Sequence, residues 1–560
     1  MAFDGIITRA VVSELNGCLL NGKINKIFEP NKNEILLGIY SCGKNYALNI
    51  CINPVNYRVH LTTHYKPNPQ NVFNFCMVLR KYLTGGTVKK IYMNGLERII
   101  YIDVDCYNDF NDLVTKTLVI ELMGKHSNVI LLNSDNTIID SLRHLNKLDN
   151  SLRDILPGYK YSVLDSSKRD FTSSTFDDFY RILQNTENVA TTLSNYYIGF
   201  SKAGISYILN NLQISTKSFS LDTYKKLYSY LKEITSDQPL LCYKTDSKKD
   251  DFYVSLHNSQ NLQVNFFIDD FYFNKEEKEK FSSYQSDLLR LILNRLKRLE
   301  DKLNTANKAL NECSKMEDYR LYGELITANL YRIQNYNQPS ITLENYYKNN
   351  EPIEIKLDGS ISPSANAKKF FKKYKKLQST YLIVQKQKEI ITAEIGYLDS
   401  IVYEIHNCQT LQDLESVYLE ISESLDLKLN AKNTPKKNGK AIPSMPVELS
   451  IDGFTIFVGK NNKQNDYLTC RIAKSSDLWF HTKDIHGSHV VLRLNKNNPA
   501  TDSIIYKCAT IAAYYSKAKL SQNVPVDYTY IKYVRKPNSA KPGMVIYTNN
   551  KTLYVNPKKP

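Results

Sequence analysis

Two heptad repeats of apolar residues constrain the fold of this chain more than any other feature. The first lies within 276–332, which we expect to form one long helix, and the second runs from Leu377 to Ile405 with a polar interruption at Lys388. Apolar residues spaced alternately three and four apart form a seam along one side of a helix, as in coiled coils. The seams consist of Leu289, Leu296, Leu303 and Leu310 with Ile292, Leu299, Ala306 and Cys313, and of Leu377, Tyr381, Val384, Ile391, Ile395, Leu398, Val402 and Ile405.

The segment 333–365 separates the two seams and is short enough for the chain to fold back on itself. At ~1.5 Å per residue, arms of about 40 to 50 residues would extend roughly 60–75 Å. A homodimeric coiled coil is the alternative that the sequence leaves open. Seams of similar length on both sides of a short insert favour an antiparallel hairpin.

The remaining sequence predicts a multidomain α+β protein, because 560 residues are too many for one hydrophobic core. Near the start, a helix at Thr8–Leu20 and another at Phe73–Leu83 accompany alternating apolar runs that predict strands. The runs are Ile24–Phe28, Glu34–Tyr40, Tyr46–Ile52, Val59–Thr62, Ile99–Val104, Leu118–Leu122 and Asn128–Leu132. We expect an α+β domain over 1–170, a helical domain over 171–270, the coiled-coil domain over 271–430, a linker over 431–446 and a second α+β domain over 447–560.

The last domain shows four runs that predict strands and one that predicts a helix. The strands are expected at Leu449–Val458, His489–Leu492, Val526–Val534 and Met544–Tyr547, and the helix at Asp502–Lys519. Between short helices of the second domain, 197–204 carries two glycines, which suits a helix–hairpin–helix whose backbone amides face a phosphate. A plain helix–helix turn is the alternative.

The net charge and the pattern of cysteines limit which partners and which cellular compartment we expect for this protein. Lys and Arg number 73 against 57 Asp and Glu, and the resulting charge of +16 favours a polyanionic partner such as RNA, DNA or an anionic membrane. A compositional bias toward Lys, Asn, Ile and Tyr is the alternative explanation. No secretory signal or membrane-spanning run is visible, and the 10 Cys include no CxxC pair, so we expect a cytoplasmic protein without a disulfide scaffold.

One segment near the C-terminus mixes basic, amide and aromatic residues in the way that RNA contact requires. Cations meet phosphates, rings stack on bases and amides bond to base edges. The alternative is that Trp479 and Phe480 belong to a core and that the lysines are simply solvated. The candidate RNA- or ribosome-binding residues are Lys460, Asn461, Asn462, Lys463, Gln464, Asn465, Arg471, Trp479, His481, Lys483 and His489.

Two further charged features can be interpreted either as ordinary surface residues or as RNA contacts. Lys368, Lys369, Lys372, Lys373, Lys375 and Lys376 surround the start of the second arm, either as a solvated helix end or as an RNA-facing collar. Glu97 and Arg98 precede a strand, where such a pair is usually a surface feature but can also contact a base and a phosphate. The three histidines 481, 486 and 489 match no zinc spacing, and nucleotide-binding and hydrolase motifs are missing. We therefore expect no metal, cofactor or catalytic residue.

A series of strings, in order along the chain, resembles the NFACT family, whose bacterial members are known as RqcH and whose animal members are known as NEMF. The resemblance covers Met1 to about Leu553. The strings are FDG (3–5), NPVNYRVHLT (53–62), FCMVLRKYLTGG (75–86), ELMGKHSNVILL (121–132), YRLYGELITANLY (319–331), SPSANAKKFFKKYKKL (362–377), GKNNKQNDYLTCRIA (459–473), DLWFHTKDIHGSHVVLR (477–493) and VDYTYIKYVRKPNSAKPGMVIY (526–547).

The resemblance implies an NFACT-N domain, a helix–hairpin–helix domain, a long antiparallel coiled-coil hairpin and a C-terminal NFACT-R domain. Members of this family bind a large ribosomal subunit, through rRNA and ribosomal proteins, that still carries a stalled peptidyl-tRNA. The bacterial ones recruit tRNA, expected to be tRNA-Ala, for mRNA-independent C-terminal tailing before degradation, with the small protein RqcP as a further partner. Peptide-bond formation belongs to the ribosome, so the resemblance implies a non-enzyme that positions tRNA.

The residues that the resemblance assigns to tRNA are Asp4, Glu97, Arg98, Lys125 and His126. The family usually has Asp-Arg where this chain has Glu97-Arg98, which keeps the charge but moves the carboxylate by about one methylene. The family also commonly has Pro at the position of His486.

Two other functions remain as alternatives. An older family name suggests a surface fibronectin-binding adhesin, although no anchor motif is visible. The first domain also resembles formamidopyrimidine-type DNA glycosylases. Those enzymes use an N-terminal Pro nucleophile followed by Glu, where this chain has Ala2 and Phe3.

Overall fold

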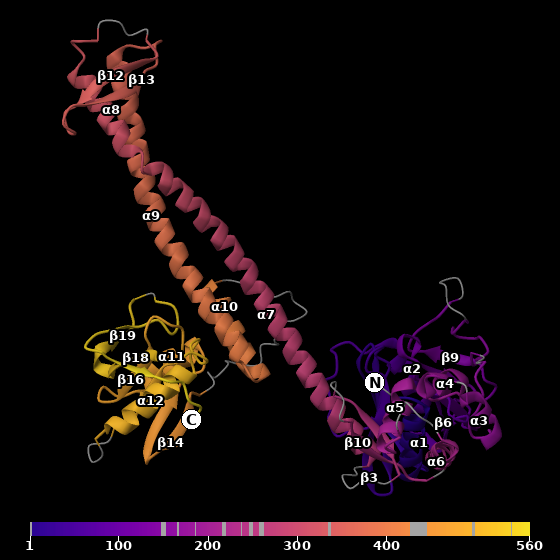
Figure 1. The fold of residues 1–560 in the computed structure, drawn as a ribbon. Helices are drawn as coiled ribbons and strands as arrows, with labels where there is room; N and C mark the ends of the chain where they lie inside the picture. The colour runs from indigo at the N-terminus through magenta and orange to yellow at the C-terminus, as the bar shows by residue number, and fades with distance from the viewer. Residues whose placement is uncertain are drawn as a thin grey trace. The chain divides into compact units, whose positions relative to one another are not determined.

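The computed structural model describes residues 3–146, 153–164, 167–184, 186–214, 220–236, 238–245, 250–256, 263–333, 338–425, 445–494, 499–538 and 540–560. Two compact units divide the chain, Met1–Glu277 and Lys278–Pro560 (Figure 1). The predicted linker 431–446 lies, except for its last two residues, outside the described residues.

A nine-stranded antiparallel sheet is the scaffold of the first unit, in the order β4-β3-β2-β1-β5-β6-β7-β8-β9. β1 and β5 join at a single residue pair, Lys23 with Thr87, so two hairpin-built halves meet there. All seven predicted strands are present, while β5 and β9 had not been predicted. The strands are β1 Lys23–Asn31, β2 Glu34–Ser41, β3 Lys44–Cys51, β4 Arg58–Leu61, β5 Thr87–Tyr92, β6 Ile99–Tyr107, β7 Leu113–Glu121, β8 Asn128–Leu132 and β9 Ile138–Ser141.

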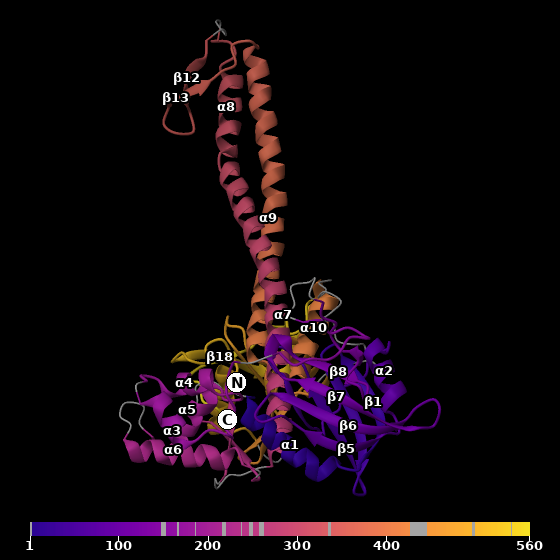
Figure 2. The same cartoon turned by 90° about the vertical axis from the view of Figure 1, so that its right-hand side faces the viewer.

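Helices cover this sheet and continue its core. α1 (Gly5–Leu19) and α2 (Asn74–Leu83) bury their apolar faces against the strands. Four further helices gather beside the sheet in Figure 2, and their buried residues belong to the same cluster. The predicted division at residue 170 therefore separates two parts that share one core. The helices are α3 Phe176–Leu183, α4 Val189–Tyr196, α5 Lys202–Asn211 and α6 Leu221–Ile234, followed by the hairpin β10 Leu241–Lys244 and β11 Phe252–Ser255.

The first turns of α7 (Val264–Cys313) belong to the first unit and are fixed there by buried charges. The Glu14 carboxylate accepts hydrogen bonds from the backbone amides of residues 264 and 265, which caps the free N–H groups of the helix start. Arg58 and Lys66 both contact Glu276, at 2.6 Å each. These contacts fix the first turns of α7 to the sheet domain.

In the second unit, α7 packs along α9 (Pro363–Asn407) in antiparallel fashion. The Gln285 side chain donates to the carbonyl of Ile405, Arg295 pairs with Glu394 at 2.7 Å, and the Cys313 thiol contacts the carbonyl of Leu377. Partner numbers on α9 fall as those on α7 rise, so the two helices run in opposite directions. The buried seam on α7 includes Ile292, Leu296, Leu299, Ala306 and Cys313.

The predicted single helix 276–332 is wrong in its bounds. The helix begins twelve residues earlier, at Val264, where Glu14 caps it, and it ends at Cys313. A separate helix, α8 (Met316–Ala328), then packs on α9, and Gly323 allows close contact with the Phe371 ring. Together with β12 (Ser340–Asn345) and β13 (Glu351–Lys356), α8 forms a small apolar cluster near the start of α9 (Figures 1 and 2).

The C-terminal part of the second unit is a six-stranded antiparallel sheet, in the order β14-β15-β17-β16-β18-β21, with α12 (Asp502–Tyr514) packed on it. The predicted strand Leu449–Val458 is two strands, because Asp452 and Gly453 both have positive φ and form a tight hairpin turn. The strand at 478–482 had been missed. The strands are β14 Val447–Ile451, β15 Phe454–Val458, β16 Leu478–Thr482, β17 Val490–Leu492, β18 Val524–Tyr530 and β21 Lys551–Val555, and a separate pair is formed by β19 Val534–Arg535 and β20 Ile546–Tyr547.

α10 (Leu411–Leu425) returns along the end of α9 and closes the apolar cluster there. None of the described helices is both long and apolar enough to cross a membrane. All ten cysteines are free thiols. The chain is thus a mixed α/β multidomain protein with two long helices between its α+β parts.

Candidate nucleic-acid interface

Three segments far apart in the sequence converge beside the first sheet, at Gly5, Leu96 and Gly199. The Gly5 amide donates to the Gly199 carbonyl at 2.8 Å. A Cβ on Gly5 would lie 2.1 Å from the Leu96 carbonyl oxygen, and one on Gly199 would lie 2.3 Å from the same atom. Gly199 also has a φ of +79°, which disfavours any side chain. The two glycines therefore hold the loop that carries Glu97 and Arg98 against the chain start and the α4–α5 turn.

Asp4 lies in the middle of this convergence and is 3% exposed. Its carboxylate accepts from the amides of Ile6 and Ile7, which caps α1, and from the hydroxyls of Ser201 and Tyr253. Burial raises the pKa of Asp4 to about 6, against the opposing effect of these hydrogen bonds. A direct tRNA contact by Asp4 stays a prediction that this burial does not favour; we expect its contribution to be indirect, through the position of α1 and α5.

Arg98 reaches the surface next to Tyr57 and the turn that contains Lys125 and His126. Its Nη1 donates to the Tyr57 hydroxyl over 3.5 Å, and its carbonyl accepts from the Leu122 amide. The Tyr57 ring lies 3.9 Å from the position of a Cβ on Gly124. Arg98 and Tyr57 are half-buried, and Lys125 and His126 are exposed. The structure thus brings Arg98 and the turn that carries Lys125 and His126 to the same tyrosine.

Tyr57 had not been singled out from the sequence. It lies in the NPVNYRVHLT string, and its ring also makes an edge contact with Phe3, with the centroids 6.4 Å apart. Only that string pointed to it, because a lone tyrosine after a turn has no spacing signal of its own.

Glu97 is half-buried. Burial and the neighbouring Asp170 raise the pKa of Glu97. Among the described residues no ion pair joins Glu97 to Arg98, although the two are adjacent in sequence. The pair therefore presents its two charges in separate environments.

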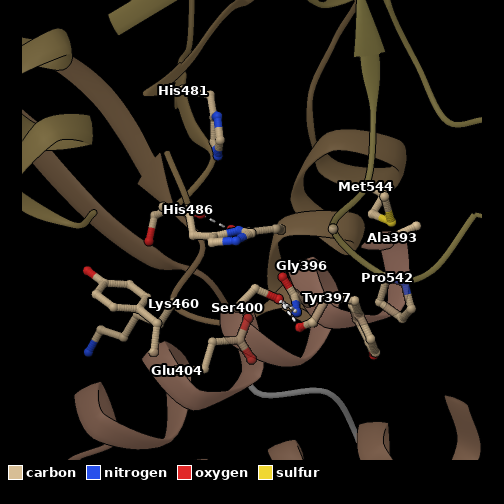
Figure 3. A pocket seen from close by; sticks show the side chains of 16 residues that line it. Ala393, Gly396, Tyr397, Ser400, Glu404, Lys460, His481, His486, Pro542 and Met544 are labelled. Atoms are coloured by element: carbon tan, nitrogen blue, oxygen red, sulfur yellow. Dashed lines mark hydrogen bonds between the residues drawn. The ribbon is translucent and has the colours of Figure 1, made fainter. Parts of the chain in front are cut away.

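The polar segment near the C-terminus turns its amides inward. Asn461 caps α11 (Asn462–Tyr467) by accepting from the Gln464 amide, and the Gln464 side chain accepts from the Lys460 amide. The Asn465 side chain accepts from the His489 amide at 3.0 Å. Asn461, Asn462, Gln464 and Asn465 are all buried. Asn461, Gln464 and Asn465 hold the local backbone, whereas Asn462 donates to the side chains of Ser400 and Glu420 beside the pocket in Figure 3; the RNA contact of all four stays a prediction.

The aromatic members of the same set lie inside the domain. Trp479 is 0% and His489 2% exposed, which is the arrangement that the core alternative predicts. His481 stacks on Trp479, with the centroids 5.7 Å apart, and burial lowers the pKa of His481 to about 4. Burial also lowers the pKa of His489, so both imidazoles are neutral at pH 7. No cluster of metal-ligating side chains exists among the described residues.

Cations are the part of this segment that reaches solvent. Lys460, Arg471 and Lys483 are exposed, whereas Lys463 pairs with Glu423 at 2.7 Å. The six collar lysines at 368–376 are exposed as well, and one of them, Lys369, pairs with Asp358. Exposed cations supply sequence-independent attraction to phosphates.

Comparison with known proteins matches the chain to two successive family models. The family model described as "NFACT N-terminal and middle domains" matches residues 4–440, and the one described as "NFACT protein RNA binding domain" matches residues 446–549. A protein named "Rqc2 homolog RqcH" from Bacillus subtilis is 35% identical over 567 residues, which cover 100% of this chain and 98% of the relative. A protein of the same name from Streptococcus pneumoniae serotype 2 is 33% identical over 561 residues, with the same coverage.

Among solved structures, the N-terminal part of a fibronectin/fibrinogen-binding protein from Streptococcus suis is similar at 29% identity. The match covers 49% of this chain and 99% of that chain, with a TM-score of 0.42. The two family models and the full-length relatives lead to one conclusion: this chain belongs to the NFACT family.

Proposed function

We propose that this protein is a ribosome-associated quality-control factor of the cytoplasm. It binds the large ribosomal subunit that carries a stalled peptidyl-tRNA and recruits alanyl-tRNA for mRNA-independent tailing of the nascent chain. The observation that carries the proposal is that Arg98 and the turn with the exposed Lys125 and His126 both lie beside Tyr57. The relatives named RqcH and the match to an RNA-binding domain support the same role.

The grouping has the chemistry of an RNA contact. A guanidinium can stack on a base or form a forked pair with a phosphate, the half-buried tyrosine ring can stack with its open face, and Lys125 supplies a point charge. Nothing in the grouping resembles a nucleophile paired with a base, so the protein positions tRNA and leaves peptide-bond formation to the ribosome. RqcP is the further partner in this proposal.

The finer architecture belongs to the same proposal. α4, the turn around Gly199 and α5 act as a helix–hairpin–helix, and α7 with α9 acts as an antiparallel coiled-coil hairpin. At ~1.5 Å per residue, the 50 residues of α7 extend about 75 Å.

The experiment is co-sedimentation with purified large subunits, together with an assay for alanine tails on a stalled reporter. The wild-type protein should co-sediment at low salt and dissociate as salt rises. The Arg98→Ala variant should lose tailing by at least about tenfold and still co-sediment, because the subunit contact uses many other cations. Arg298→Ala is the matched control, since it removes one exposed arginine of α7 that belongs to neither candidate interface. Undiminished tailing by Arg98→Ala, or no co-sedimentation of the wild type at low salt, would overturn the proposal.

A further inference from the structure

The hairpin between β6 and β7 projects beyond its neighbours in the nine-stranded sheet. On one side, β5 pairs with β6 only as far out as Asp105, and on the other, β8 pairs with β7 only as far out as Thr117. Past these residues β6 and β7 continue to pair with each other, out to Tyr107 and Leu113. Residues 106–114 are therefore a two-stranded finger, the β6–β7 finger, that extends past both neighbouring strands.

Three large apolar side chains are exposed at the end of this finger. Phe110 is 86% exposed, Tyr107 71% and Leu113 62%. Tyr107 and Leu113 are register partners, so their side chains lie next to each other on one face of the hairpin, and Phe110 lies in the turn. A single exposed apolar residue is common on any protein, but three together at one tip indicate a surface that binds a partner.

Hydrogen bonds within the turn hold Phe110 in place. The Asn108 side chain accepts from the backbone amides of Phe110 and Asp112, at 2.9 and 2.8 Å, and the Asn108 amide donates to the Asp112 carbonyl at 3.0 Å. Asn111 adopts a φ of +67°, a conformation that asparagine tolerates. A turn fixed in this way loses little conformational entropy when the tip binds a partner.

The charge of the finger is opposite to that of the whole chain. Residues 99–115 contain four Asp and no Lys or Arg, in a chain of net charge +16. Asp105 pairs with Lys89 at 3.4 Å, whereas within the described ranges no ion pair neutralises the exposed Asp109 and Asp112 on either side of Phe110. Carboxylates repel the phosphates of RNA and of an anionic membrane, so the complementary surface is that of a basic protein.

We propose that the β6–β7 finger docks on a basic protein of the large ribosomal subunit, with Phe110 in an apolar cleft and Asp109 and Asp112 facing cations around it. Proteins that pack against rRNA carry positive charge to neutralise its phosphates, so the subunit offers surfaces of this kind. An aromatic anchor in a pocket, with charged groups at the rim, is the usual arrangement of a binding hot spot. The inference rests on the proposed function for the identity of the subunit, and it adds a protein contact to the RNA contact beside Tyr57.

The first experiment places a photo-cross-linker at the tip, by Phe110→p-benzoylphenylalanine in the full chain, and irradiates the protein bound to purified large subunits. We expect an RNase-resistant adduct with one basic protein of the subunit. An adduct with rRNA alone, or with a second copy of this chain alone, would overturn the inference. So would the lack of any adduct from a variant that co-sediments like the wild type.

The second experiment reverses the charge of the tip and measures the Kd for large subunits. Asp109→Lys combined with Asp112→Lys should weaken binding by at least about tenfold against a basic protein, whereas the same change would strengthen a contact with rRNA. Phe110→Ser should weaken binding by about tenfold as well. Met77→Ser is the matched control, because Met77 is an apolar residue of α2 that is 55% exposed. Tighter binding after charge reversal, or unchanged affinity of a Phe110→Ser variant that melts like the wild type, would contradict the proposal.

Failure of this inference differs from failure of the proposed function. A wild-type protein that does not co-sediment with large subunits at low salt would overturn both. Normal co-sedimentation and tailing without a protein adduct at position 110 would overturn only the docking of the finger.

Discussion

The two candidate RNA-binding regions contain similar types of residue, basic, polar and aromatic. The structure arranges those residues in opposite ways. Around Tyr57, a backbone pinned by two glycines presents Arg98, Lys125 and His126 at the surface. In 459–489, the amides satisfy backbone groups and the aromatics fill a core, so that only scattered cations reach solvent. Residue type alone therefore does not separate a binding surface from its scaffold; what separates them is whether the local backbone needs the polar groups for itself.

The largest expected effect comes from a substitution that disturbs the close backbone contact at Gly199. Gly199→Ala places a Cβ against the Leu96 carbonyl at a positive φ, and we expect it to destabilise the first unit by about 3 kcal/mol or more. Gly17→Ala, in open space on α1, should instead stabilise by up to about 1 kcal/mol. Scanning calorimetry of both variants measures the difference. Equal melting temperatures would show that the three segments are not held by close backbone contact.

The second prediction concerns Asp4 beneath the same site. Its folded-state pKa of about 6 exceeds the ordinary 3.8, so the folded state binds more protons between these pH values and stability falls as pH rises through them. The difference corresponds to about 3 kcal/mol at most. Asp4→Asn removes this titration, so the free energy of unfolding of the wild type relative to the variant should decline from pH 4 to pH 6. Parallel pH profiles of the two proteins would contradict the buried arrangement.

The third prediction separates scaffold from surface in the C-terminal region. Asn465→Ala leaves the His489 amide without its acceptor and should destabilise that domain by about 2 kcal/mol. Lys483→Ala should leave stability within about 0.5 kcal/mol and weaken RNA binding with a smaller salt slope. The single tryptophan, Trp479, reports unfolding of this domain by fluorescence. A stable Asn465→Ala variant with weakened RNA binding would place the amide at the RNA surface instead.

The smallest expected effect is at Tyr57. Tyr57→Phe removes the hydroxyl that accepts from Arg98 and keeps the ring, so tRNA affinity should fall by about twofold to tenfold. The tRNA affinity of Tyr57→Leu, which also removes the ring, should fall further if the ring stacks on a base. Filter binding with one purified tRNA measures the affinities of the wild type and of both variants. Equal affinity of all three proteins would remove Tyr57 from the site.

The sequence predicted the elements with local signals and missed those set by tertiary contacts. Alternation predicted seven strands of the first sheet, but β5 pairs with β1 at one position only and had no clear pattern. The start of α7 depends on Glu14, about 250 residues away. The family's acidic-Arg pair pointed to Arg98, yet nothing local placed Tyr57 between it and the 124–126 turn. The Asp452-Gly453 turn was readable in principle and was read as part of one strand.

The most direct test of the central claim is purification of a tagged copy from its own cells at low salt, with sequencing of the RNA that accompanies it. Large-subunit rRNA together with one enriched tRNA species, and loss of that tRNA but not the rRNA in Arg98→Ala, is the predicted result. No RNA with the wild-type protein, or a tRNA enrichment that Arg98→Ala leaves intact, would contradict it.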